Sequence, residues 1–434
     1  MKLFAIGYYA PPQLTPQAIQ VARLLYHLDA EVTLLHGRDA QFAGTYDQYP
    51  DFFARIDPLA VPNPGPPLRG MAHRAALRAL PLYGACPDLF GAWRRCARGP
   101  ALNRIARNRP DALLSFGMPM TDHLLALELK ARTGLPWLAH FSDPWAGNPF
   151  HQTSWLEHQV NAAMERRVIV RADGVLFTSR GTLELVMDKY PVAWRRKAAV
   201  LPHAWDMDNF AFPLAPRRIR GPLKIIRHIG ACYGARSPAP LFDALARIHA
   251  TSPQLLANAA FELVGHVSPA LLESASLRAL PPGLVTVRAQ VGYRAALQLA
   301  RDSDALLVID APSAAASVFL PSKLVEYIGA GRPVWGITPP GTSADLIAQW
   351  GGGARLCASP TDVDAVARML VAALAALAAL DADALHPGPA QLRQRLAAPC
   401  VAQVLRLRAE HAIARATAST PAFAGTAHET AVRR

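Results

Sequence analysis

Short apolar strands alternate with amphipathic helices along most of this chain, and the alternation occurs in two rounds. The first round opens with a strand at 2–7 and a helix that starts at Thr15-Pro16, and the second opens at 223–230. Thr15 suits an N-cap, and Pro16 stands where a helix tolerates a missing N–H. Strands separated by helices of roughly 10–15 residues indicate βαβ units, whose strands are parallel.

The two rounds predict two domains. A chain of 434 residues exceeds what one core normally supports, and 51% hydrophobic with 18% charged residues indicates a globular protein. We therefore expect an α/β fold of two Rossmann-like parallel-sheet domains that face a cleft, where ligand binds outside the strand ends. The predicted divisions are an N-terminal domain at 1–210, a linker at 211–222, a C-terminal domain at 223–388, a helical segment at 389–415 packing back on the first domain and a disordered tail at 416–434.

Individual elements follow from the same pattern. The further strands are predicted at 31–35, 111–116, 136–141, 174–178 and 198–202, and in the second round at 260–264, 284–287, 305–309 and 333–336. Helices are predicted at 121–133, 155–171 and 181–189, and an Ala/Leu-rich helix at 365–380. Residues 40–100 are rich in Pro and Arg, and we expect them to be irregular. The C-terminal helical segment is expected to be interrupted at Pro399.

The formal charge of +13 is carried mainly by arginine, since the chain has only six lysines. Such a surface favours anionic partners, namely nucleotide phosphates, acidic lipid headgroups or nucleic acid. Nucleic acid is excluded as the expected partner because no binding motif is present and the basic residues are dispersed. The Arg/His-rich segment 69–109, with Phe90 and Trp93, fits either an anionic membrane surface or a solvated helical face.

Cysteine usage and hydropathy predict the compartment. The five cysteines are widely spaced and form no CxxC pair, so neither a disulfide framework nor a zinc site is expected. The N-terminus lacks the pattern of a signal peptide, and the most apolar stretch contains Arg368 and falls short of the about 20 residues of a membrane span. We expect a cytoplasmic protein that is at most peripheral at the inner membrane.

One block, residues 319–335, combines groups that suit a nucleotide. Pro321 opens a helix, and Lys323 and Glu326 lie three positions apart on one face of it. The N–H groups of a helix N-terminus suit a phosphate, and a carboxylate one turn later can accept hydrogen bonds from ribose hydroxyls. The alternative is an ordinary amphipathic helix that ends at Gly329 and Gly331.

Several segments in order resemble one family. They are Tyr8-Tyr9-Ala-Pro11-Pro12 and the stretches 111–119, 135–145, 171–179, 200–206, 228–238 and 319–335. Over roughly residues 1–395 the series is similar to glycosyltransferase family 4, which has the two-domain GT-B fold. The resemblance implies a retaining enzyme that moves a sugar from a nucleotide-diphosphate donor and uses neither a divalent metal nor a further cofactor. Cations and helix N-termini would stabilise the leaving diphosphate.

The resemblance also assigns donor-site residues. Glu326 matches the second glutamate of the family's paired motif and would hold the ribose. Arg236 stands where the family usually has a lysine, and its guanidinium suits the donor diphosphate. Gly230 and Ser322 complete this expected site. Lys323 either serves the same phosphates or faces water, and Arg236 is alternatively a solvated loop charge.

Asp143 is the residue expected to contact acceptor or sugar, and Arg236 is expected to assist the departing diphosphate. The alternative role of Asp143 is to cap the turn at Pro144 and Trp145.

Three Asp-x-Asp pairs have the spacing that metal-dependent glycosyltransferases use, and they are interpreted as turns or helix caps: Asp206/Asp208, Asp362/Asp364 and Asp381/Asp383.

The sequence departs from the family at two positions. Val318 stands where the family has the first glutamate of the pair, and Ala231 stands where it has a phosphate-site arginine. Our leading interpretation is a glycosyltransferase that transfers to a glycan or lipid-linked acceptor in bacterial surface polysaccharide or glycolipid synthesis. The departures keep open a degenerate scaffold that binds nucleotide or a partner protein without turnover. A nucleotide-sugar 2-epimerase of the same fold is the third possibility, although no set of acidic and histidine residues for proton abstraction is evident.

Overall fold

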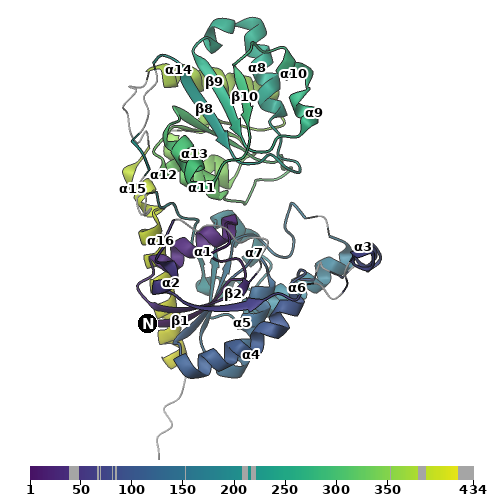
Figure 1. Cartoon of the computed structure of the whole chain (residues 1–434), viewed down its shortest axis with the longest axis vertical. Coiled ribbons are helices and arrows are strands. Elements are labelled where there is room, and N and C mark those ends of the chain that lie inside the picture. The colour runs from purple at the N-terminus through teal and green to yellow at the C-terminus, as the bar shows by residue number, and fades with distance from the viewer. Residues whose placement is uncertain are drawn as a thin grey trace, which may run out of the picture.

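Two parallel sheets flanked by helices form two domains, one above the other in Figure 1. The computed structural model describes residues 1–418 except 39–47, 66–67, 69, 81, 84–85, 152, 208–213, 217–220, 352 and 380–387. The predicted α/β fold of two Rossmann-like domains is confirmed. Most of the predicted linker at 211–222, and the predicted tail from residue 419 on, lie outside the described residues.

The first sheet has seven parallel strands in the order β3-β2-β1-β4-β5-β6-β7. Its strands are β1 (Lys2–Ile6), β2 (Glu31–Arg38), β3 (Asp57–Pro62), β4 (Ala112–Phe116), β5 (Trp137–Phe141), β6 (Gly174–Phe177) and β7 (Ala198–Val200). Its helices are α1 (Pro16–Tyr26), α2 (Phe52–Arg55), α3 (Gly70–Ala79), α4 (Gly91–Asn108), α5 (Thr121–Thr133), α6 (Trp155–Arg171) and α7 (Arg180–Met187).

Both faces of this sheet are buried, as parallel sheets require. Along β1, Leu3 and Ala5 pack in the core beneath α1, whereas Phe4 and Ile6 pack in the core beneath α4 and α5. The helix ends follow their expected chemistry. Thr15 caps α1 by accepting a hydrogen bond from the N–H of Ala18, and α5 ends at Gly134 in the left-handed conformation with φ 71°.

The second sheet has six parallel strands in the order β10-β9-β8-β11-β12-β13. Its strands are β8 (Lys224–Ile229), β9 (Ala259–Val264), β10 (Val285–Arg288), β11 (Ala305–Ile309), β12 (Val334–Ile337) and β13 (Cys357–Ala358). Its helices are α8 (Ala239–Thr251), α9 (Pro269–Leu272), α10 (Ala275–Arg278), α11 (Tyr293–Arg301), α12 (Ser322–Gly329), α13 (Thr342–Gly351) and α14 (Val363–Ala379).

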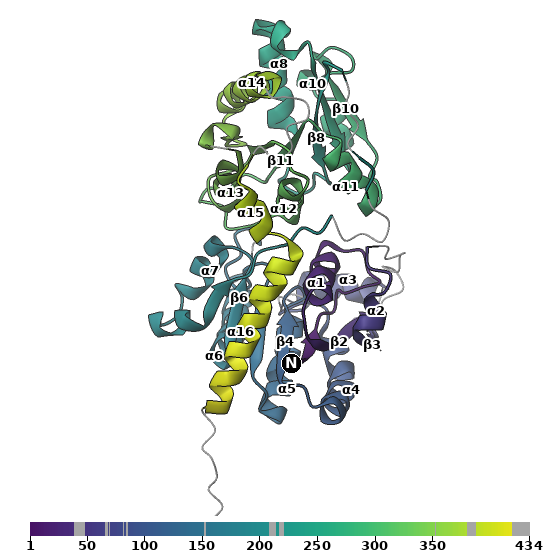
Figure 2. The ribbon, with the colours of Figure 1, turned by 90° about the vertical axis from the view of Figure 1, so that its left-hand side faces the viewer.

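The C-terminal helices α15 (Ala390–Arg395) and α16 (Ala398–Ala418) lead back to the first domain. Figure 2 shows α16 running along that domain, where it contacts α1, β5 and β6. Val401 and Leu405 are buried in the same core as α1. The break between the helices falls just before Pro399, which stands in the first turn of α16, where proline is tolerated.

The region 40–100 is more regular than we expected. Its described part contains α2, β3, α3 and the start of α4, which continues through Pro100. Trp93 is fully buried on α4 and donates a hydrogen bond to the carbonyl oxygen of Val61 at 3.2 Å. Trp93 is therefore a core residue, and the expectation that it lies on a membrane surface is wrong for this side chain. Among the described residues, no helix has the length and apolarity to cross a membrane.

Candidate functional site

A cavity of about 400 Å³ lies between the two domains. The first domain contributes the loop after β1 and the start of α1, including Gln20, and the second contributes the loop after β8, the start of α11 and α12. Gly230, Tyr293, Lys323 and Glu326 line it on the second-domain side. The cavity thus occupies the place where a doubly wound fold binds ligands, outside the carboxyl ends of parallel strands.

The loop after β8 comes very close to the first turn of α12. Gly230 has φ 138°, a conformation that side chains rarely adopt, and a Cβ atom there would stand 2.6 Å from Lys323 Nζ. Ser322 opens α12 directly after Pro321 and also lines the cavity. Glycine at 230 thus leaves space beside an ammonium group and a helix N-terminus, which is the environment that an anion needs.

Two cations flank this space. The guanidinium of Arg236 lies 3.7 Å from the Asp310 carboxylate, and its buried Nε donates no hydrogen bond within the described part of the chain. Burial first, and then the charge of Arg236, lowers the pKa of Lys323 to about 8. Arg236 is therefore not simply a solvated loop charge, and Lys323 faces the cavity and not bulk water. Because the Asp310 carboxylate is the nearest acidic partner of Arg236 among the described residues and lies 3.7 Å from it, both cations can still bind an anion.

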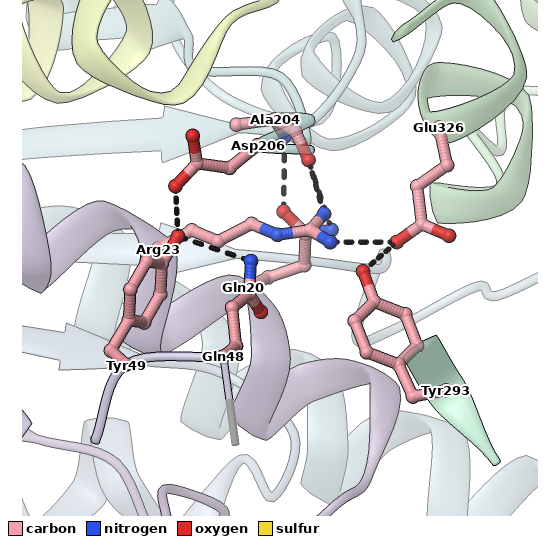
Figure 3. Close-up of polar contacts among 8 residues, drawn as sticks. All are labelled: Gln20, Arg23, Gln48, Tyr49, Ala204, Asp206, Tyr293 and Glu326. Atoms are coloured by element: carbon pink, nitrogen blue, oxygen red, sulfur yellow. Dashed lines mark hydrogen bonds and ion pairs between the residues drawn. The ribbon is translucent and has the colours of Figure 1, made fainter. Parts of the chain in front are cut away.

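Glu326 is the carboxylate of the site, and it is bound from two sides. Its Oε1 accepts hydrogen bonds from Arg23 Nη2 at 2.9 Å and from the Tyr293 hydroxyl at 2.7 Å (Figure 3). Burial raises the pKa of Glu326, and the charges of Arg23 and Lys323 oppose that shift. The side chain retains 15% exposure, which is enough to present it to the cavity.

Arg23 is anchored by the first domain. Its Nη1 donates to the carbonyl oxygen of Ala204 at 2.6 Å, and Ala204 also exchanges two hydrogen bonds with the Gln20 side chain. Beside them, the Tyr49 hydroxyl donates to the buried Asp206 carboxylate, as Figure 3 shows. A network of polar groups therefore lies behind Gln20, which lines the cavity on this side.

Asp143 lies away from these groups, in the loop after β5. Burial raises the pKa of its carboxyl group, and His151 partly offsets the shift. The carboxylate accepts no hydrogen bond from any described residue, and the N–H of Ala146 is taken instead by Glu165. The structure therefore shows no turn cap by Asp143, and no described residue hydrogen-bonds to its carboxylate.

A second cavity of about 540 Å³ lies in the first domain, and Pro144 and His151, but not Asp143 itself, are among the residues that line it. Aromatic rings of Tyr9, Phe90 and Trp145 line it together with polar groups of Asn148 and His151. Met118 at its rim has φ 76°, a strained conformation for a residue with a side chain. Aromatic surfaces with a few polar groups and local strain are typical of a ligand site.

The two departures from the family pattern, Val318 and Ala231, lie in different parts of the interface between the domains. The carbonyl oxygen of Val318 accepts hydrogen bonds from the hydroxyls of Ser179, Thr182 and Thr342, so Val318 holds its loop against the first domain. A Cβ atom at Gly181 would lie 3.1 Å from the Cα of Val318. Ala231 lines the nucleotide-sized cavity next to Gly230.

The Asp-x-Asp pairs are held by protein groups where the structure describes them. Asp362 caps α14 through the N–H of Ala365, and Asp364 pairs with Arg247. Asp206 is bonded to His27 and Tyr49. Asp208, Asp381 and Asp383 lie outside the described residues. Within the described ranges, no group of three or more His, Cys, Asp or Glu side chains is placed to hold a metal ion.

Two residues of this site did not emerge from the sequence. Tyr293 follows Gly292 at the start of α11, in a stretch without a recognisable motif. Arg23 carried a usable signal, because a charged residue stands among Val21, Ala22 and Leu24 on the buried side of α1. A buried arginine needs a partner, so that position indicates an ion pair with another element.

Comparison with known proteins finds one matching family model and several similar folds. Residues 16–204 match the family model described as Glycosyl transferase 4-like domain. HepE from Anabaena, solved with UDP and glucose, has a TM-score of 0.62 at 15% identity, covering 95% of this chain and 100% of that chain. The lipopolysaccharide outer core galactosyltransferase WaaB, in its apo form, has a TM-score of 0.59 at 15% identity, covering 96% and 99%.

A protein assigned as a UDP-N-acetylglucosamine 2-epimerase from Listeria monocytogenes is also similar, with a TM-score of 0.56 at 14% identity, covering 93% and 94%. No curated protein matches the chain. At such low identities these structures establish the fold. The chain has the GT-B fold, and the match of residues 16–204 to the Glycosyl transferase 4-like domain model agrees with the resemblance seen in the sequence.

Lys323 should be detectable as an abnormal lysine. Because burial and Arg236 disfavour its charged form, we expect its ammonium to lose a proton near pH 8, about two units below an ordinary lysine. NMR titration of lysine labelled with ¹³C at Cε should show two such lysines, because burial also lowers the pKa of Lys197 to about 8. Lys323→Met should remove one of them. A Lys323 signal that titrates above about pH 10 would contradict the buried two-cation site.

Proposed function

We propose that this chain is a retaining glycosyltransferase that moves a sugar from a nucleotide-diphosphate donor to a glycan or lipid-linked acceptor. The observation that carries the proposal is that Lys323 and Glu326 line the interdomain cavity, with the charge of Arg236 acting on Lys323. Two neighbouring cations suit the diphosphate of a nucleotide, and a carboxylate suits its ribose. That HepE was solved with UDP and glucose supports a uridine nucleotide as the donor.

The donor would lie along the second domain. The diphosphate would lie between Gly230, Ser322 and the two cations, and the ribose would bind Glu326. In the transition state charge grows on the departing β-phosphate, and groups already fixed in place stabilise it without reorganisation. Lys323 and Arg236 would act in that way on the diphosphate. With these cations present the step needs no divalent metal.

The acceptor would enter from the first domain. Its sugar or polyol would lie in the aromatic cavity beside Met118 and Trp145, with one hydroxyl near Asp143. In a retaining reaction the hydroxyl attacks from the face that the diphosphate leaves, and the diphosphate takes the proton. Asp143 would orient the acceptor hydroxyl or a donor-sugar hydroxyl through its carboxylate. Because position 318 is a valine, sugar recognition would use groups other than a glutamate at that position.

A membrane-bound acceptor is supported by the surface around α3. From Asp57 to Asp111 the chain has nine arginines and, between those two, a single acidic residue, Asp88. Arg74 and Arg78 are exposed on α3, which protrudes at the edge of the first domain in Figure 1. Exposed apolar side chains lie in the same region: Met71, Leu80, Leu82, Leu89, Trp155 and Leu156. Basic and apolar groups together suit an anionic membrane surface. Localisation at the inner membrane and a role in surface glycan synthesis are part of this proposal.

Glu326→Gln should weaken UDP binding by about 10-fold or more, because a hydrogen bond to a charged group is worth about 1.5–3 kcal/mol. Titration calorimetry measures the affinity. Glu262→Gln is the matched control, since Glu262 is also bonded to a buried arginine of the second domain, Arg227, at 2.7 Å. If Glu326→Gln and the native chain bind UDP with equal affinity, the assignment of the ribose to Glu326 is wrong.

Turnover should release free nucleoside diphosphate when the chain is mixed with a panel of donors and a bacterial lipid extract. Asp143→Asn should lower kcat about 100-fold with unchanged UDP affinity, the size expected for one polar group acting on a reacting hydroxyl. Asp188→Asn, at an exposed aspartate, should leave kcat unchanged. Binding without release would favour the degenerate scaffold, and a changed sugar without net nucleotide release would favour the epimerase.

Arg74→Glu/Arg78→Glu should weaken binding to vesicles containing anionic lipid by about 30-fold or more in a co-sedimentation assay, since each of the two lost basic groups contributes about 1 kcal/mol near such a surface. Arg368→Glu/Arg408→Glu changes the net charge equally at exposed sites on α14 and α16. An equal loss of vesicle binding in both double variants would show that the net charge of the protein drives binding and that α3 does not dock on the membrane.

A further inference from the structure

The ion pair between Arg23 and Glu326 joins the two domains at the cavity. Arg23 comes from α1 of the first domain and Glu326 from α12 of the second, and the Nη2–Oε1 distance is 2.9 Å. The Arg23 side chain is fully buried, whereas that of Glu326 is 15% exposed. Such a pair contributes to stability only when both charges are well bonded, so its burial at this point needs a reason.

The direction of approach supplies that reason. Glu326 lines the cavity, whereas Arg23 does not, so the guanidinium contacts the carboxylate from behind. Arg23 and Tyr293 both donate to Oε1, while Oε2 accepts no hydrogen bond from the described residues (Figure 3). The carboxylate is thereby held with one oxygen occupied and the other open.

We propose that Arg23 is a positioning residue which orients Glu326 for the ribose and makes nucleotide recognition by the second domain depend on closure against the first. The proposal rests on the proposed function, because it requires the ribose to bind Glu326. It extends that function by giving the first domain a part in donor binding.

Arginine suits this role better than lysine. Its planar fork donates through Nη1 to Ala204 and through Nη2 to Glu326, which ties one residue of each domain to one rigid group. The charged and titratable groups facing Glu326 are Arg23, Lys323, Tyr327 and Tyr293. Burial raises the pKa of Glu326, and Arg23 is the largest influence that lowers it. Removal of Arg23 should therefore favour the protonated acid, which has one acceptor fewer.

Other contacts keep the domains closed beyond the ion pair. The Ser179 and Thr182 hydroxyls of the first domain donate to the Val318 carbonyl oxygen of the second. The rings of Phe150 and Phe319 stack with centroids 4.4 Å apart. Removal of Arg23 thus alters Glu326 without removing every contact between the domains.

The test is UDP affinity, measured by calorimetry for Arg23→Met, Glu326→Gln and the double variant. Arg23→Met should weaken binding about 10-fold, and the double variant should bind no more weakly than Glu326→Gln, because Arg23 acts through Glu326. Arg227→Met is the control, since Arg227 is equally buried and paired with Glu262 outside the cavity. It should lower the melting temperature without changing UDP affinity.

The pH profile separates positioning from general stability. UDP affinity should fall as the pH drops through the pKa of Glu326, and in Arg23→Met that fall should begin at a higher pH. Arg23→Lys serves if Arg23→Met does not fold, because it keeps the charge but loses the fork, and it should also weaken binding.

Tighter UDP binding in Arg23→Met would overturn the proposal, because Arg23 would then compete with the ribose. Unchanged affinity together with a clear loss in Glu326→Gln would also overturn it and leave the proposed function standing. Unchanged UDP affinity in Glu326→Gln would instead contradict the proposed nucleotide site itself.

Discussion

The parallel direction of all strands in both sheets is the constraint on which the site depends. In a parallel sheet every strand ends at the same edge, so the loops after the strands collect there. In the first domain one of these loops leads into α1, and in the second domain others carry Gly230 and lead into α12. Residues far apart in the sequence therefore meet at one cavity between the domains.

The charges in that cavity are poorly solvated, and this determines their chemistry. Lys323 and Arg236 repel each other, and burial further disfavours the lysine's charge, so a phosphate between them would relieve both costs. Burial raises the pKa of Glu326, and the charges of Arg23 and Lys323 oppose that shift. The site thus keeps cations where a diphosphate would lie and a carboxylate where a ribose would lie.

The sequence predicted the regular part of this architecture well. The helix at 155–171 and the strand at 305–309 have the predicted bounds, because their ends carry clear signals such as the capping box of Ser154 and Glu157. Helix α4 was missed because Pro100 lies inside it and interrupts the expected pattern. β13 was missed because a strand of two residues carries no periodic signal.

The site was predicted only in part, for a physical reason. Local spacing places Lys323 and Glu326 on one helix face, and the family resemblance adds Gly230 and Arg236. The Arg23–Glu326 pair joins positions 303 residues apart, and spacing along one element carries no information about such a contact.

The most direct test of the account is a crystal structure of the chain with UDP. The account predicts the diphosphate between Gly230, Lys323 and Arg236, a ribose hydroxyl within hydrogen-bonding distance of Glu326 Oε2, and Arg23 still bonded to Oε1. UDP bound away from both cations would contradict it.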